Sequence, residues 1–196
     1  MIAGDRIRLR PLRDSDLPLL RAWFDDPEVM RFWGMTSNPV VDQRFAEDLV
    51  GRFARFEVAG YFAIDLPDGT TIGRVEFERL STETRSAEVM ILIGDRSAWG
   101  KGYGTDAMTA LLRYLFHTRN LHRVSLTVLA WNRRAIRSYK KVGFTVEGTL
   151  RDDLYFDGRY HDQLVMGILH HEFDARWPLL RTAASDTSGP GSTAPA

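Results

Sequence analysis

The segment SAWGKGYGTDAMTALLRYLF, residues 97–116, has glycine at positions 100, 102 and 104 and continues directly into a helical pattern. Glycine allows backbone N–H groups to approach a phosphate closely, and a helix N-terminus adds partial positive charge. From Met108 onward, apolar residues recur at the spacing of one helix face. The segment therefore predicts either an anion-binding loop at the start of an amphipathic helix or a turn that needs only the flexibility of glycine.

The spacing of the glycines excludes two common nucleotide loops. A Walker loop requires a glycine, four residues and then Gly-Lys followed by Ser or Thr, which this chain lacks. A dinucleotide fingerprint requires G-x-G-x-x-G directly after a strand. Here the pattern is G-x-G-x-G, and residues 94–99 separate it from the apolar run at 89–93. Any phosphate site at this loop must be of another kind.

Composition limits the classes of partner. The 196 residues suit one domain with a normal core, and 26 basic and 26 acidic residues give no net charge. That balance does not favour binding to nucleic acid or to an anionic membrane. No cysteine is present, so disulfides and a cysteine nucleophile are excluded. With no secretory signal and no apolar run of about 20 residues, a cytoplasmic protein is expected.

Periodicity predicts a mixed sheet with helices on its faces, forming one layered α/β domain over residues 1–180. Residues 181–196 are small, polar and rich in Pro and Gly, so we expect a disordered tail. Strands are expected near 6–12, on either side of the turn at 67–69, at 87–93, at 123–131 and on either side of Asp157-Gly158. Helices are expected near 17–24, 41–56, 104–116 and 132–143. The continuous apolar run at 89–93 is typical of a strand buried on both faces.

Several segments together resemble the GNAT acetyltransferase superfamily, especially its RimJ/RimL and spermidine acetyltransferase branch. They are LRPLRDSDLPLL (9–20), DPEVMRFW (26–33), WGKGYGTDAMTALLRYLF (99–116), AWNRRAIRSYKKVGF (130–144) and FDGRYHDQLVMGIL (156–169). The resemblance runs in the expected order from about residue 5 to residue 172. It implies a mostly antiparallel, twisted sheet of about seven strands. It also implies transfer of an acetyl group from acetyl-CoA to an amine, and it allows a homodimer.

The resemblance implies a binding site for acetyl-CoA. The backbone of Ile91, Leu92 and Ile93 would pair with the pantetheine arm, and the glycine loop would hold the pyrophosphate through its N–H groups. Trp99 stands where the family usually has Gln or Arg, so the side-chain contact there is not expected to carry over. The residues expected at the cofactor are Ile91, Leu92, Ile93, Trp99, Gly100, Lys101, Gly102, Tyr103, Gly104, Thr105, Asn132 and Arg137.

Catalytic roles also follow from the resemblance. Asn132 and Tyr139 are two helical turns apart and share a face. Tyr139 matches the position where the superfamily commonly has its general acid, although a tyrosine packed in the core is the alternative. Glu88 is the first choice for the base, acting through water, with a solvated strand-end glutamate as the alternative. Other candidates for the base are Glu147, Asp152 and Asp153.

The acceptor amine is expected near Phe32 and Trp33, which suggest an aromatic wall, with core packing as the alternative. The loop that contains them, 31–43, lacks the clustered carboxylates expected for a polyamine site, although Asp25, Asp26 and Glu28 lie just before it. A peptide N-terminus or a small amine metabolite or antibiotic is therefore preferred over a polyamine. A non-catalytic acetyl-CoA sensor or scaffold remains the alternative of another class.

No metal is expected. The segment HHEFD, residues 170–174, contains metal-binding residue types, but His170 and His171 are adjacent and point apart. His161 and Asp162 form a further polar pair, for which a hairpin ion pair is the simpler interpretation.

Overall fold

The computed structural model describes residues 1–33 and 59–178. The predicted helix at 41–56 and the predicted tail at 181–196 lie outside these residues. The strands are β1 (Ile2–Ala3), β2 (Arg8–Pro11), β3 (Gly60–Asp65), β4 (Thr71–Ser81), β5 (Ser86–Ile93), β6 (Arg123–Leu129), β7 (Thr145–Phe156) and β8 (Arg159–Leu169). The α-helices are α1 (Leu17–Phe24), α2 (Pro27–Met30), α4 (Tyr103–Arg113), α5 (Arg133–Val142) and α6 (His170–Arg176). Short 3₁₀ helices span Asp14–Asp16, Arg31–Trp33 and Arg96–Ala98, and a π-helical turn, Tyr114–Thr118, extends α4.

One sheet of eight strands runs through the described residues in the order β1-β2-β3-β4-β5-β6-β8-β7. Every neighbouring pair is antiparallel except β5 and β6, which are parallel. The mixed, mostly antiparallel sheet predicted from the sequence is therefore confirmed. The eighth strand is the two-residue β1, which is too short to leave an alternating pattern.

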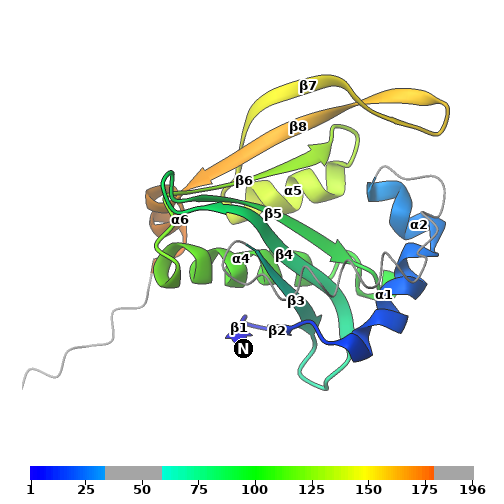
Figure 1. The fold of residues 1–196 in the computed structure, drawn as a ribbon, viewed down its shortest axis with the longest axis horizontal. Helices are drawn as coiled ribbons and strands as arrows, with labels where there is room; N and C mark the ends of the chain where they lie inside the picture. Colours follow the sequence, from blue (N-terminus) through cyan, green and yellow to red (C-terminus); the bar gives the residue numbers. More distant parts are fainter. Residues whose placement is uncertain (34–58, 179–196) are drawn as a thin grey trace, which may run out of the picture.

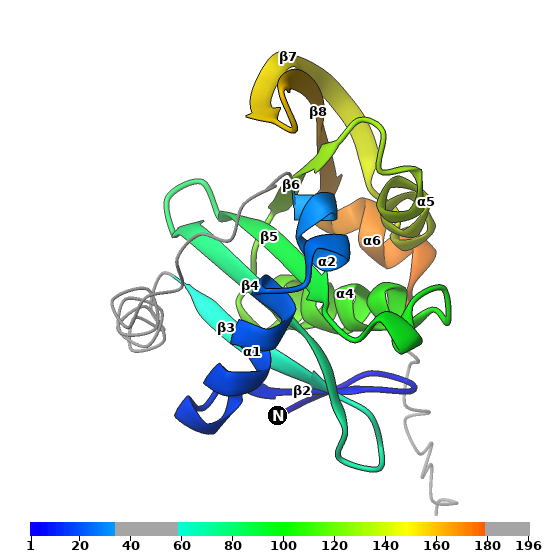
Figure 2. The same ribbon diagram turned by 90° about the vertical axis from the view of Figure 1, so that its right-hand side faces the viewer.

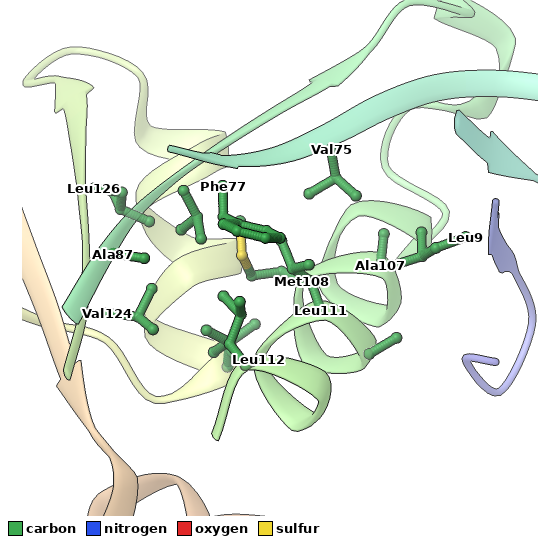
Figure 3. Close-up of a cluster of buried hydrophobic side chains, with 14 of the residues drawn as sticks. Leu9, Val75, Phe77, Ala87, Ala107, Met108, Leu111, Leu112, Val124 and Leu126 are labelled. Atoms are coloured by element: carbon green, nitrogen blue, oxygen red, sulfur yellow. The ribbon is translucent and has the colours of Figure 1, made fainter. Parts of the chain in front are cut away.

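The main core lies between the sheet and the helices α4, α5 and α6 (Figures 1 and 2). The apolar stripe predicted along α4 is fully buried, including Met108, Leu111 and Leu112. In Figure 3 these side chains lie against Phe77 and Val75 of β4. Burial of a Leu, Phe or Met side chain contributes about 1.5–3 kcal/mol, so this stripe fixes α4 on the sheet.

The opposite face of the sheet carries α1 and α2. Leu20, Trp23 and Phe24 of α1 are buried there together with Tyr61 and Ala63 of β3. Figure 2 shows these helices on the side away from α5 and α6. No helix among residues 1–33 and 59–178 is long and apolar enough to cross a membrane.

A buried ion-pair network attaches the start of α1 to the sheet. Arg10 of β2 contacts Asp16 at 2.7 Å and Asp65 of β3 at 2.7 Å. Burial alone would raise the pKa of Asp16. Hydrogen bonds from the Arg10 side chain and the Arg13 backbone N–H outweigh burial and hold this pKa below its usual range. The contribution of Asp16 to stability is therefore complete above the unfolded pKa and is lost as pH falls through the folded value.

We expect Asp16→Asn to lower the free energy of unfolding by about 2 kcal/mol at pH 7, because a hydrogen-bonded, charged pair is lost while Arg10 keeps Asp65. The difference from the unmodified chain should shrink below about pH 4, where the unfolded carboxyl is protonated. Urea denaturation at pH 7 and pH 3 measures both quantities. Asp14→Asn is the matched control, since Asp14 lies exposed in the same turn. Equal losses in the two variants would contradict the role of the network.

Candidate active site

The two parallel strands β5 and β6 separate after a short paired stretch. They pair only from Ser86 with Arg123 to Glu88 with Ser125, although β5 continues to Ile93. Figure 1 shows the strands diverging beyond this point. A cleft of about 560 Å³ occupies the gap. Residues from both faces of the sheet line it, so the cleft passes between the helices α4 and α5 on one side and the α2 region on the other.

Most of the residues predicted for the site line this cleft. They are Phe32, Trp33, Ile91, Leu92, Ile93, Trp99, Gly100, Gly102, Tyr103, Gly104, Thr105, Asn132, Arg137 and Tyr139. Lys101 and Glu88 do not line it. Met90 was expected to be buried within a strand covered on both faces, but it is 40% exposed and lines the cleft. The apolar run in β5 thus reflects a strand that faces a cleft on one side.

The glycine loop presents unpaired backbone donors to the cleft. Gly100 and Gly102 have φ values of +74° and +89°, in the left-handed region that glycine adopts without strain. Gly102 caps α4 and offers no side chain, so the first N–H groups of this helix, from Tyr103 to Thr105, have no intrahelical acceptor. Donors of this kind at a helix N-terminus are suited to a phosphate.

The N-terminal segment fixes the outer side of the glycine loop. The Arg6 side chain donates to the carbonyl of Lys101 at 2.8 Å, and its guanidinium lies 4.6 Å from the Tyr103 ring centroid. Asp106, in the first turn of α4, accepts hydrogen bonds from the backbone N–H groups of Asp5 and Arg6. Lys101 therefore contributes its carbonyl to the support of the loop.

Trp99 forms a wall of the cleft. Its indole N–H donates to the carbonyl of Ile93 at 2.7 Å, which fixes the ring at the end of β5. The guanidinium of Arg134 lies 4.0 Å from the Trp99 ring centroid and 4.6 Å from that of Phe32. Burial lowers the pKa of Arg134. A cation from α5 thus lies against the aromatic residue that replaces the family's usual Gln or Arg, a role that sequence spacing did not reveal.

The basic side chains of α5 fall into two groups, those that line the cleft and those that do not. Arg134, Arg137 and Lys141 line the cleft, whereas Arg133 and Lys140 do not. Residues three or four positions apart share a helix face, so one face of α5 carries positive charge toward the cleft. Among these residues, only Arg137 was expected at the cofactor from the sequence.

Tyr139 lies on α5 with its ring packed against Phe144, at a centroid distance of 6.0 Å. Burial raises the pKa of Tyr139 to about 12. Within residues 1–33 and 59–178, its hydroxyl has no hydrogen-bond partner. Asn132 caps the same helix, since its side-chain oxygen accepts from the Ala135 N–H at 3.1 Å. Asn132 therefore caps α5 and also lines the cleft.

The candidate bases lie outside the lining of the cleft. Glu88 is in the paired part of β5, where Arg79 donates to both of its oxygens at 3.0 Å. Glu147 is ion-paired with Arg123. The hydrogen bond that the Arg123 side chain donates holds the pKa of Glu147 below its usual range. Asp152 and Asp153 are exposed on β7. The choice among these carboxylates remains a prediction.

His161 packs in the hairpin interior, stacked on Phe156 at a centroid distance of 4.0 Å. Its Nδ1 accepts from the indole N–H of Trp131 at 3.2 Å, and its Nε2 lies 3.3 Å from the Phe156 carbonyl. Asp162 instead accepts from the Asp152 backbone N–H. The suggested pair between His161 and Asp162 is therefore wrong, because the adjacent side chains leave opposite faces of β8.

A sheet that separates into a cleft beside a glycine-rich helix N-terminus is the arrangement that the resemblance to acetyl-CoA-dependent acyltransferases implies. A family model described as "Acetyltransferase (GNAT) domain" matches residues 6–145. The chain belongs to this family and is an acetyl-CoA-dependent N-acetyltransferase.

Individual members of the family are similar to this chain over most of its length. The chain is 31% identical to the spermidine N(1)-acetyltransferase of Escherichia coli K12, covering 88% of this chain and 91% of that protein. It is 29% identical to the putative ribosomal N-acetyltransferase YdaF of Bacillus subtilis, and this match covers 70% of this chain and 75% of that protein. The crystal structure of spermidine N-acetyltransferase from Vibrio cholerae with CoA and spermine superposes with a TM-score of 0.79 at 28% identity, covering 87% and 99%.

Proposed function

We propose that the chain transfers the acetyl group of acetyl-CoA directly to a primary amine, with no acetylated enzyme intermediate. The observation that carries the proposal is the cleft that opens toward both faces of the sheet. Acetyl-CoA enters from the side of α4 and α5, and the amine enters from the side of Phe32 and Trp33. The two reactants then meet within the gap between β5 and β6, where proximity supplies much of the rate acceleration.

The cofactor is held by backbone groups for most of its length. The N–H groups of Gly102 to Thr105 bind the pyrophosphate, and the positive face of α5 adds charge-assisted contacts from Arg137 or Arg134. The pantetheine arm pairs with the edge of β5 that β6 leaves free beyond Glu88. This placement is supported by the absence of a β6 partner for Ile91 to Ile93.

Tyr139 acts at the leaving sulfur. Because its pKa is about 12, the hydroxyl stays protonated near neutral pH and donates a hydrogen bond to the departing thiolate. A free thiol has a pKa of about 8.5, so Tyr139 is a weaker acid than the product thiol. We therefore infer that stabilisation of developing negative charge is its main contribution. The proton lost by the attacking amine balances the one that the thiolate finally gains.

The carboxylate Glu88 serves as the base only through water. It lies two residues before Met90, which corresponds to about 7 Å along a strand, and Arg79 holds both of its oxygens. A water in the cleft then takes the proton from the amine and passes a proton to the carboxylate of Glu88.

Polyamines are a second, narrower candidate for the acceptor. Two of the relatives are named as spermidine N-acetyltransferases. In this chain, Glu78 of β4 is directly opposite Glu88 of β5. Two carboxylates that face each other across neighbouring strands repel, so a bound cation beside them is favourable. Arg79 already supplies one positive charge at Glu88. A peptide N-terminus remains the competing acceptor, as the name of YdaF illustrates.

A CoA-release assay across spermidine, spermine, short peptides, amino sugars and aminoglycosides tests the proposal. We expect release with at least one primary amine and none with its tertiary-amine analogue. Initial rates at varied concentrations of both substrates should give intersecting double-reciprocal lines, because both must be bound together. Parallel lines would contradict direct transfer. Binding of acetyl-CoA without release in any mixture would favour the sensor alternative.

A further inference from the structure

A cluster of two imidazoles and one carboxylate lies remote from the cleft, where the end of α4 meets α6. His117 belongs to the π-helical turn, and His170 and Asp174 lie on α6. Figures 1 and 2 both show α6 beside the end of α4. One ligand atom from each of the three residues lies within 4.8 Å of the others. The sequence offered His170 with His171, but the residue that joins His170 is His117.

The atoms that converge in this cluster form no hydrogen bond, although each imidazole Nε2 lies within ion-pair distance of Asp174. Four buried polar side-chain atoms are unpartnered in the described part of the chain, and three of them are His117 Nε2, His170 Nε2 and Asp174 Oδ1. An unsatisfied buried polar atom costs about 1–3 kcal/mol. Three such atoms gathered at one point indicate a ligand that satisfies them together.

Two contacts within the cluster have the length found between ligand atoms of a tetrahedral metal site, and each runs to a different oxygen of Asp174. His117 Nε2 lies 3.3 Å from Asp174 Oδ1, and His170 Nε2 lies 3.4 Å from Asp174 Oδ2. Ligand atoms about 2.0–2.1 Å from a tetrahedral zinc ion are about 3.3–3.4 Å apart. Imidazole nitrogen and carboxylate oxygen are common zinc ligands, and Asp174 is partly open to solvent, which leaves room for a water in the fourth position.

The local backbone also favours a specific role at this position. A π-helical turn is rare and is often found at functional sites. Here it holds His117, whose ring meets His170 edge-on at a centroid distance of 5.1 Å. The same turn brings Phe116 against His170, stacked at 5.1 Å.

We propose that His117, His170 and Asp174 form a binding site for a divalent transition-metal cation of the zinc class, which joins the end of α4 to α6. The ion binds through the three unpartnered atoms and keeps water as a further ligand. His117 lies about 20 Å along the helix from the glycine loop. The metal therefore stabilises the fold and leaves the acetyl-transfer step unchanged. This inference replaces the expectation of no metal and is independent of the proposed function.

Calorimetric titration of the untagged, chelator-treated full chain with Zn²⁺ tests the site. We expect one equivalent to bind and Co²⁺ to give the visible absorption of a tetrahedral complex, whereas Mg²⁺ should not compete. At a free Zn²⁺ concentration about a hundredfold above Kd, Tm should rise by about 5–10 °C. His117→Asn and His170→Asn should each weaken binding by at least about tenfold and abolish this rise.

His171→Asn is the matched control, because His171 is exposed on the same helix and lies outside the cluster. It should bind Zn²⁺ as the unmodified chain does. Circular dichroism of the metal-free variants establishes that each is folded, and Asp174→Asn supplies a third independent ligand variant. Absence of saturable Zn²⁺ binding, or equal binding in the His117→Asn and His171→Asn variants, would overturn the proposal.

Discussion

Replacement of Tyr139 by Phe is expected to lower kcat by about a hundredfold, the usual effect of removing one hydrogen-bond donor from developing negative charge. The substitution keeps the ring that packs against Phe144 and removes only the hydroxyl. Because no group in the described residues bonds to that hydroxyl, its loss leaves no partner unsatisfied. Stability and acetyl-CoA affinity should therefore stay close to those of the unmodified chain. Steady-state CoA release and calorimetric titration with CoA measure the two effects separately.

The pH dependence of kcat provides a second test of the same role. With a pKa raised to about 12, Tyr139 remains protonated at neutral and mildly alkaline pH. Ionisation removes the donor only above that value, so kcat should not fall near pH 10, where an unperturbed tyrosine titrates. A descending limb near pH 10 that disappears in Tyr139→Phe would indicate an exposed phenol. Unchanged kcat in that variant would remove Tyr139 from the mechanism.

The elements that the sequence predicted well are those specified by neighbouring residues. Asn132 and Gly143 delimit α5 in the structure as their capping preferences suggest. The glycine loop needs positive φ at Gly100 and Gly102, and only its local spacing distinguished it from other phosphate loops. The stripe on α4 likewise predicted the buried face, because helical periodicity is a local property.

Contacts between distant segments escaped the sequence analysis. Arg134 was one of five basic residues on a short helix, and only the approach of Trp99 across the cleft distinguishes it. His117 lies on a π-helical turn and meets Asp174 of α6, a contact between distant segments that no apolar pattern records. In a sequence, an apolar residue that lines a ligand cleft cannot be told from one that packs inside the protein. The pattern around Met90 therefore indicated a strand covered on both faces.

The glycine loop gives the second large effect. We expect Gly102→Ala to raise the Kd for acetyl-CoA by at least about tenfold, which corresponds to about 1.4 kcal/mol. At φ +89° an alanine is strained by about 1–2 kcal/mol, and relief of that strain turns the N–H groups away from the pyrophosphate. The added methyl group meets only the Arg6 guanidinium, at 3.7 Å, so the protein itself has room for it. The loss in affinity must then arise from weaker contacts between the loop and acetyl-CoA, while kcat at saturating acetyl-CoA changes little.

Gly69→Ala separates this effect from backbone strain. Gly69 has the same φ of +89°, has no atom within 4 Å of an added methyl group, and lies in the turn between β3 and β4, outside the cleft. Both variants should therefore lose about 1–2 kcal/mol of stability, since the strain is intrinsic to alanine in this conformation. Only Gly102→Ala should bind acetyl-CoA more weakly in calorimetric titration. Equal affinities in the two variants would mean that the pyrophosphate does not contact the loop at Gly102.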